Sequence, residues 1–182
     1  MGFDLSKIKK RLDAIKGTAE GLTAEAGWLP SAVYEDGTPV AYVAAIQEHG
    51  APERSIPPRP FISETIEKNS DAWVKEASTA LKVAATTGRP ATAAADLIGV
   101  AMASDIQKTI AEGGFDDLKG ITLMIRKMKD EHKGDPSWHM SGAKVGEAAA
   151  RVEAGEPGSS RTKPLNDTGF LIATVIGRAA KS

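Results

Sequence analysis

The apolar residues of this chain recur mostly at helical spacing. At the start, residues 4–16 predict an amphipathic helix, because apolar side chains fall three or four positions apart opposite several lysines and Arg11. Gly17 and Gly21 end this helix. Its apolar positions are Leu5, Ile8, Leu12 and Ile15.

A short β-prone region follows. Residues 22–29 alternate weakly and predict a strand. The turn signal Glu35-Asp36-Gly37 either joins two short strands, at 32–34 and 40–43, or precedes a short helix over 41–48. We favour the helix, because Gly50 at its end tolerates the left-handed conformation of a C-terminal cap.

Two longer helices are predicted next. Residues 61–86 carry apolar side chains at near-heptad spacing, and Gly88 is a plausible stop. Pro90 suits the first turn of a second helix that ends at Gly113-Gly114. We expect the two helices to pack as an antiparallel pair and to supply most of the core. Their apolar positions are Ile62, Ile66, Trp73, Ala77 and Leu81 in the first, and Ile98, Met102, Ile106 and Ile110 in the second.

The last third of the chain is richer in loops. Short helical pieces are possible at 121–131 and 142–153, but the segment 115–164 is expected to be a long, exposed insertion that is poorly ordered in a lone subunit. A turn or short helix at 165–170, capped by Asp167 or Thr168, and a strand at about 171–178 close the chain.

Composition narrows the class of protein. The 182 residues fit a single domain, and the absence of cysteine excludes a disulfide scaffold and cysteine-based zinc sites. A net charge of −1 argues against a free-standing nucleic-acid binder. No apolar stretch approaches the roughly 20 residues that span a bilayer. The first residues lack the apolar region of a secretory signal, and the match of Met-Gly and Ser6 to a myristoylation site is attributed to chance.

No residue cluster predicts a catalytic, cofactor or metal site. His132 and His139 share a segment with acidic residues, but the spacing matches no metal motif, so a solvated loop is preferred. His49 is assigned a structural role at a helix end. The chain contains no nucleophile elbow, P-loop or dinucleotide fingerprint. The acidic residues considered are Glu112, Asp116, Asp117, Asp130, Glu131 and Asp135.

Three features instead favour contact with partners. The run from Ile56 to Phe61 contains three prolines, which lock the backbone and reduce the entropy lost on docking. A basic cluster could touch DNA phosphates, but interleaved acids favour a solvated face or a subunit surface. Trp138 is either an anchor in a partner's pocket or packs on its own domain. The basic cluster comprises Arg126, Lys127, Lys129 and Lys133.

Four motifs in order resemble a known family. They are the runs at 40–50 (VAYVAAIQEHG), 56–61 (IPPRPF), 123–129 (LMIRKMK) and 163–169 (KPLNDTG). Together they are similar to the neck or tail-completion (head–tail joining) proteins of long-tailed bacteriophages and prophages, over about residues 20 to 178. His49 stands where the family usually has an aromatic residue, and Asn166 where it commonly has an apolar one.

The resemblance implies an α+β fold, with a small antiparallel sheet packed against two long helices, a long loop insertion and extended arms. It also implies a non-enzymatic structural virion protein without cofactors, which forms a ring, commonly of six subunits. The expected partners are other copies of the chain, a tail terminator or tail tube protein, and a head-completion or connector protein. DNA would pass through the ring without specific binding, and no membrane is involved. Assembly would take place in the host cytoplasm.

Within that picture, specific residues are expected to make the contacts. Phe61 would anchor the loop in the core, and Arg59 would donate a forked hydrogen bond to a carboxylate or carbonyl of the same or the next subunit. The alternatives are a tail terminator, a DNA-contacting adaptor, and a small virion-associated hydrolase that uses His139 or Glu48. The predicted interface residues are Arg54, Ile56, Pro57, Pro58, Arg59, Pro60, Phe61, Arg126, Lys127, Lys129 and Trp138.

Overall fold

The fold comes from a computed structural model, which describes residues 21–54, 56–118, 120–165 and 169–181. Contacts divide the chain into two compact units. Unit 1 is Met1–Gly113 with Leu171–Ser182, and unit 2 is Gly114–Phe170. The helix predicted over 4–16 and the proposed caps Asp167 and Thr168 lie outside the described residues.

Unit 1 contains a small antiparallel sheet. Strand β1 (Leu22–Trp28) pairs with β2 (Val175–Lys181), and the register runs from Leu22 opposite Lys181 to Trp28 opposite Val175. The strand predicted at 22–29 is therefore confirmed. The prediction for the C-terminal strand was wrong at its start, because Leu171 and Ile172 lie in a short helix, α7 (Phe170–Ala173). Burial of Leu171 outweighs the weak strand preference of this segment.

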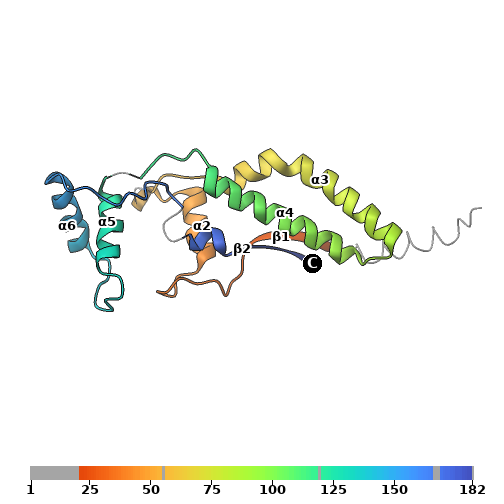
Figure 1. The fold of residues 1–182 in the computed structure, drawn as a ribbon, viewed down its shortest axis with the longest axis horizontal. Coiled ribbons are helices and arrows are strands. Elements are labelled where there is room, and N and C mark those ends of the chain that lie inside the picture. The colour runs from red at the N-terminus through yellow and green to blue at the C-terminus, as the bar shows by residue number, and fades with distance from the viewer. Residues whose placement is uncertain (1–20, 55, 119, 166–168, 182) are drawn as a thin grey trace, which may run out of the picture. The chain divides into compact units, whose positions relative to one another are not determined.

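Two long helices pack beside each other, and the second of them also lies on the sheet (Figure 1). Helix α3 (Phe61–Thr87) ends at Gly88, whose φ of 73° is left-handed and whose N–H donates to the carbonyl of Ala84. Helix α4 (Ala91–Glu112) follows after Pro90, which lies at the cap position just before the first turn. Both helices and the α+β class are confirmed.

Polar pairs tie α3 to α4 across their apolar interface. The indole N–H of Trp73 donates to Asp105 at 2.8 Å, and the hydroxyl of Thr65 donates to that of Thr109 at 2.7 Å. The buried residues of α4 are mainly small or β-branched, as the low aromatic content requires: Ala91, Ala94, Ile98, Ala103, Ile106 and Ile110.

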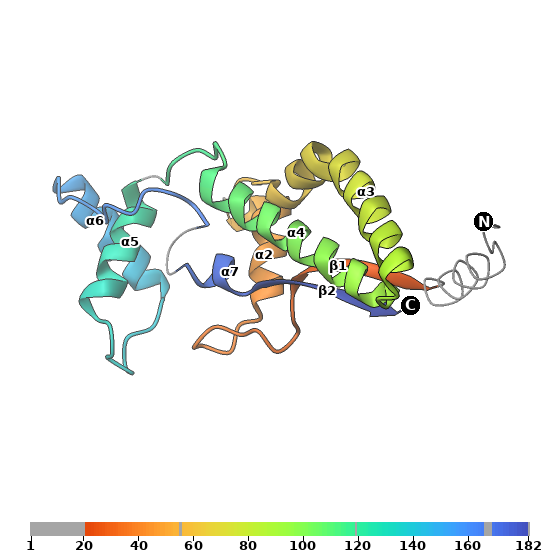
Figure 2. The ribbon, with the colours of Figure 1, turned by 45° about the vertical axis from the view of Figure 1, so that its right-hand side comes forward.

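Helix α4 lies directly on the backbone of β2 (Figure 2). A methyl group on Gly99 would lie 2.4 Å from the nitrogen of Arg178, and one on Gly177 would lie 1.7 Å from the carbonyl oxygen of Gly99. Asp96 accepts the N–H of Ala179 at 2.6 Å on the same side of the helix. Only glycine at both positions permits this approach.

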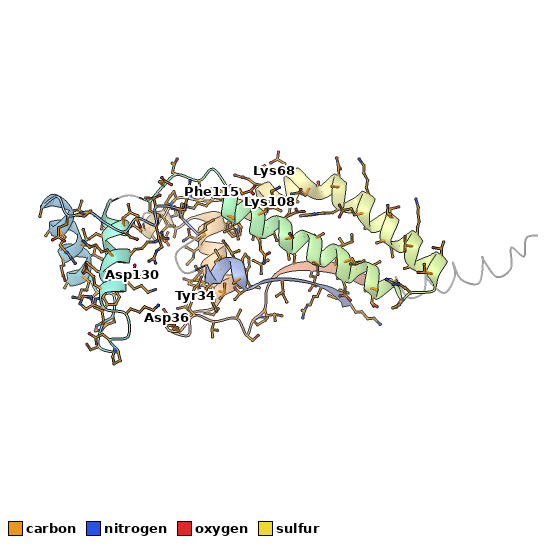
Figure 3. All side chains as sticks on the ribbon, viewed as in Figure 1. Tyr34, Asp36, Lys68, Lys108, Phe115 and Asp130 are labelled. Carbon is orange, nitrogen blue, oxygen red and sulfur yellow. The ribbon has the colours of Figure 1, made fainter. Side chains whose placement is uncertain are left out.

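Helix α2 (Val40–His49) precedes α3 in unit 1. It follows a turn in which the N–H of Gly37 donates to Tyr34 and that of Tyr34 donates to Thr38 (Figure 3 labels Tyr34 and Asp36). A single bridge joins Val33 to Pro39. The favoured helix is thus confirmed, and the β-prone pieces are reduced to that bridge.

Unit 2 has a small core of its own. Helices α5 (Gly120–Glu131) and α6 (Gly142–Glu153) match the helical pieces predicted at 121–131 and 142–153. The poor order expected of residues 115–164 in a lone subunit stays a prediction, and so does the single domain. The core side chains are Met124, Met128 and Ala148, with Ile125, Trp138 and Val152 packed against them.

Candidate functional site

The loop between α2 and α3 is held by several hydrogen bonds, and the carboxylate of Glu48 accepts three of them. Glu48, in the last turn of α2, is only 5% exposed. Its Oε2 accepts the N–H of Ile62 at 2.8 Å, and its Oε1 accepts the N–H of Ser63 at 3.0 Å and the Ser63 hydroxyl at 2.5 Å. Because the first N–H groups of a helix have no partner within it, Glu48 caps α3 from a different helix.

A second pair of contacts closes the loop on α2. The backbone N–H of Arg59 donates to the carbonyl of Gln47 at 2.7 Å, and the Arg59 guanidinium donates to the Gln47 side-chain oxygen at 2.5 Å. Arg59 is only 8% exposed. The Arg59 acceptors found here therefore belong to the same chain, and the guanidinium is buried rather than presented to a neighbour.

The turn between these contacts is tight. Ala51 and Ile56 exchange both backbone hydrogen bonds, at 2.9 and 3.1 Å. Gly50 has a φ of 74°, and a methyl group there would lie 2.8 Å from the nitrogen of Pro58 and 2.9 Å from the Ile56 carbonyl oxygen. The loop therefore folds back onto the end of α2, and glycine is required at position 50.

The far end of the loop is fixed in the core, as predicted. Phe61 is fully buried, and its ring packs edge to face on that of Trp28, with the two ring centroids 6.0 Å apart. The Trp28 indole N–H donates to the carbonyl of Leu171 at 2.9 Å, so the contact extends to β1 and α7. The loop is thus held at both ends.

Two of the three prolines in the run 56–61 of this rigid loop remain exposed. Pro57 and Pro58 face solvent, while Arg59 and Phe61 on the same run are buried. Tyr42, Ala45 and His49 are exposed at spacings of three and four, which places them on one face of α2. We call these five residues the proline-loop surface: Tyr42, Ala45, His49, Pro57 and Pro58.

The other predicted loop residues take supporting positions. Ile56 is half-buried in its bridge with Ala51, and Pro60 is half-buried at the cap position of α3. Arg54 ends a short 3-10 helix, Pro52–Arg54. Within the run 56–61, Arg59 and Phe61 are therefore buried and hold the loop in place, whereas Pro57 and Pro58 are exposed.

The predicted contact residues of unit 2 mostly hold that unit together. Arg126 donates to the carbonyls of Arg161 and Lys163 at 2.6 and 3.0 Å, and Lys127 donates to that of Pro157 at 3.1 Å. These bonds tie the segment 157–163 to α5. Lys129, by contrast, is exposed.

Trp138 packs on its own unit. It lies against the Met124 and Met128 core and stacks on His132 with ring centroids 5.8 Å apart. Its indole nitrogen is buried without a hydrogen-bond partner in the structure. Of the two roles considered for Trp138, the geometry supports packing within the subunit.

The remaining candidate side chains form no metal centre in the part of the chain that the structure describes. No group of three or more histidine and acidic side chains gathers there to hold a metal ion. His139 is exposed, and its Nδ1 lies 3.0 Å from the carbonyl of Ser137. None of the helices among the described residues is both long and apolar enough to cross a bilayer.

Sequence reasoning placed Glu48 near a helix end but missed its role as a cap. A signal was present, because α3 begins after a proline and its cap position has no side chain that could accept a hydrogen bond. Comparison of the chain with protein-family models, with curated proteins and with solved structures finds no match.

Proposed function

We propose that this chain is a structural protein of the neck or tail of a long-tailed bacteriophage, which completes the tail and joins it to the head connector. It acts as a ring, commonly of six copies, and the proline-loop surface is a contact between one copy and the next. The observation that carries the proposal is the exposure of Pro57 and Pro58 on a loop in which Arg59 and Phe61 are buried.

Rigidity is what makes this loop suitable for a contact. The loop is fixed by the Arg59–Gln47 and Ala51–Ile56 bonds, and its prolines restrict the backbone further. A surface that already has its bound shape loses little entropy on association. In a ring each contact joins two different patches of neighbouring subunits. One pair of complementary patches, repeated around the axis, is therefore sufficient.

The two rival functions receive less support from the geometry. A DNA-contacting adaptor would use the basic cluster, but Arg126 and Lys127 donate to carbonyls of their own unit. A hydrolase that uses Glu48 would need a free carboxylate, whereas this one accepts three hydrogen bonds from α3. A tail terminator remains an alternative position in the same particle.

The test is assembly of a variant with the exposed prolines replaced. Pro57→Asp/Pro58→Asp introduces two charges at the proposed contact without touching a buried group. Mass photometry should show a discrete ring for the original chain and smaller species for this variant, with far-UV circular dichroism unchanged. In an infected or induced host, heads and tails should accumulate unjoined.

Pro30→Asp is the matched control, because Pro30 is also an exposed proline of unit 1. It should leave both the ring and head–tail joining intact. If the double variant assembles and joins like the original chain, the contact role of the proline-loop surface is wrong.

A further inference from the structure

The two edges of the small sheet differ in how they are covered. On β2, the N–H of Ala179 donates to Asp96 of α4 at 2.6 Å, and the carbonyl of Val175 accepts from Gln107 of α4 at 3.5 Å. Helix α4, which lies along the sheet in Figure 2, therefore binds backbone groups on the outer edge of β2. Within the described residues, neither a third strand nor a side chain binds the outer edge of β1 in the same way.

The bond to Ala179 also shows which groups of β1 point outward. In an antiparallel pair, two residues that lie opposite each other direct their N–H and C=O groups either toward each other or both away from the partner strand. Ala179 points outward and lies opposite Ala24, so Ala24 points away from β2. Since the direction alternates along a strand, the same holds for every second residue. We call the outward groups of these residues the open edge: Leu22, Ala24 and Ala26.

Strand β1 carries none of the usual protection of an edge strand. A row of unpaired N–H and C=O groups is a template for a further strand, and proteins commonly block it with proline, lysine or a covering helix. The seven residues of β1 include no proline and no lysine, and their only charge is Glu25. The side chains of Ala24 and Ala26 are small. The open edge is therefore suited to bind an extended backbone.

We propose that β1 of a second copy pairs antiparallel with the open edge, centred on Ala24. The two subunits then share a sheet of four strands in the order β2, β1, β1, β2. Pairing stops at two copies, because α4 binds groups on the outer edge of each β2. The contact joins two identical surfaces about a two-fold axis, so it is distinct from the ring contact proposed above.

Charge and backbone geometry select the register of this pairing. With Ala24 opposite Ala24 of the second copy, Thr23 lies opposite Glu25, and both are exposed. Sliding one strand by two residues toward its C-terminal end would set Glu25 opposite Glu25, and like charges directly opposite are destabilising. It would also extend the pairing to Gly27, whose φ of 155° departs from strand geometry. The register centred on Ala24 avoids both.

The first test removes an outward N–H without touching the pairing of β1 with β2. Proline is tolerated on an edge strand where the missing N–H faces solvent, so Ala24→Pro should fold but not pair between copies. Both proteins carry Pro57→Asp/Pro58→Asp, so that the proposed ring contact does not contribute. Sedimentation velocity should show a concentration-dependent dimer, roughly ten-fold weaker with Ala24→Pro. A monomer at every concentration without Ala24→Pro, or a dimer that Ala24→Pro leaves unchanged, would overturn the proposal.

A pair of charge variants tests the register. Thr23→Lys places a cation opposite Glu25 of the second copy, and Thr23→Glu places a like charge there, each twice in a dimer. The first should tighten the dimer several-fold and the second should weaken it. Both lose the bond from the Thr23 hydroxyl to the carbonyl of Ala180, so they are matched in that respect. Equal dimerisation of the two variants would contradict the pairing of Thr23 with Glu25.

Amide hydrogen exchange of the same Pro57→Asp/Pro58→Asp protein, read by NMR, needs no substitution in β1. The amides of Ala24 and Ala26 should exchange more slowly as the protein concentration rises, because the second copy then covers the open edge. The amides of Thr23 and Glu25 point toward β2 and should be protected at every concentration. Exchange at Ala24 that does not depend on concentration would overturn the proposal.

Discussion

The carboxylate of Glu48, in the last turn of α2, accepts both the backbone N–H and the hydroxyl of Ser63, in the first turn of α3. Capping by a residue of the preceding helix replaces the usual cap at the position before the helix, which here is a proline. These hydrogen bonds fix the position of the end of α2 against the first turn of α3.

Replacing Glu48 should therefore weaken the fold. Glu48→Ala leaves partly buried N–H groups of α3 without their acceptor, and we expect a loss of about 2 kcal/mol in the free energy of unfolding. Urea denaturation followed by circular dichroism measures it. His49→Ala, at the exposed neighbouring position, is the control and should be close to neutral. An unchanged urea midpoint for Glu48→Ala would show that the cap contributes nothing.

The glycines at the contact of α4 with β2 should not tolerate a side chain. Gly99→Ala and Gly177→Ala each place a methyl group against backbone atoms that cannot move aside, so each should cost about 2 kcal/mol or more. Thermal unfolding should show the loss. Gly146→Ala, a helical glycine with open space around it, should instead stabilise by about 0.5–1 kcal/mol. Equal effects at all three positions would disprove the close approach.

Trp138 should behave as a core residue and not as an anchor for a partner. Trp138→Ala should destabilise unit 2 by about 3 kcal/mol, because it removes the ring from the Met124 and Met128 core. Trp138→Phe should be nearly neutral, since the indole N–H that it removes has no partner. Hydrogen exchange of α5 and α6, read by mass spectrometry, distinguishes the two variants. Normal exchange in Trp138→Ala would exclude the core role.

Arg59→Ala should lower the stability of unit 1 rather than act only on assembly. The buried guanidinium bonds Gln47, so its removal should cost about 1.5–3 kcal/mol. Urea unfolding of the purified chain gives the value. The sequence left open whether Arg59 bonds the same or the next subunit, and an Arg59→Ala variant with unchanged stability but defective ring formation would favour the next subunit.

Acid should weaken unit 2 through Glu131. The Arg151 guanidinium, which donates to Glu131, holds the pKa of that carboxyl below its usual value, and Lys127 and His132 act in the same direction. The pairing stabilises the folded state fully at any pH above the pKa that Glu131 has in the unfolded chain. This stabilisation is lost as the pH falls through the pKa of Glu131 in the folded state. Hydrogen exchange of α5 and α6 should differ between the original chain and Glu131→Gln at pH 7 and converge at low pH. A difference that persists at low pH would contradict this assignment.

Much of the secondary structure followed from the sequence. Apolar residues at helical spacing, with Gly88 and Pro90 between them, were sufficient to locate α3 and α4, because these signals act within a few residues along the chain. The stop at Gly50 and the helix before it were found in the same way. The start of β2 was missed, since the helical conformation of Leu171 depends on burial among distant residues.

Tertiary structure alone decided which residues of the proline loop are available for contact. Arg59, Pro57 and Pro58 are neighbours in the sequence, yet folding buries the first against Gln47 and leaves the two prolines in solvent. The same applies to Glu48 and to Gly99 with Gly177, whose partners lie well beyond the reach of any local pattern. Propensity and periodicity report on short-range interactions, whereas a cap between helices or a backbone contact exists only once separate segments have packed together.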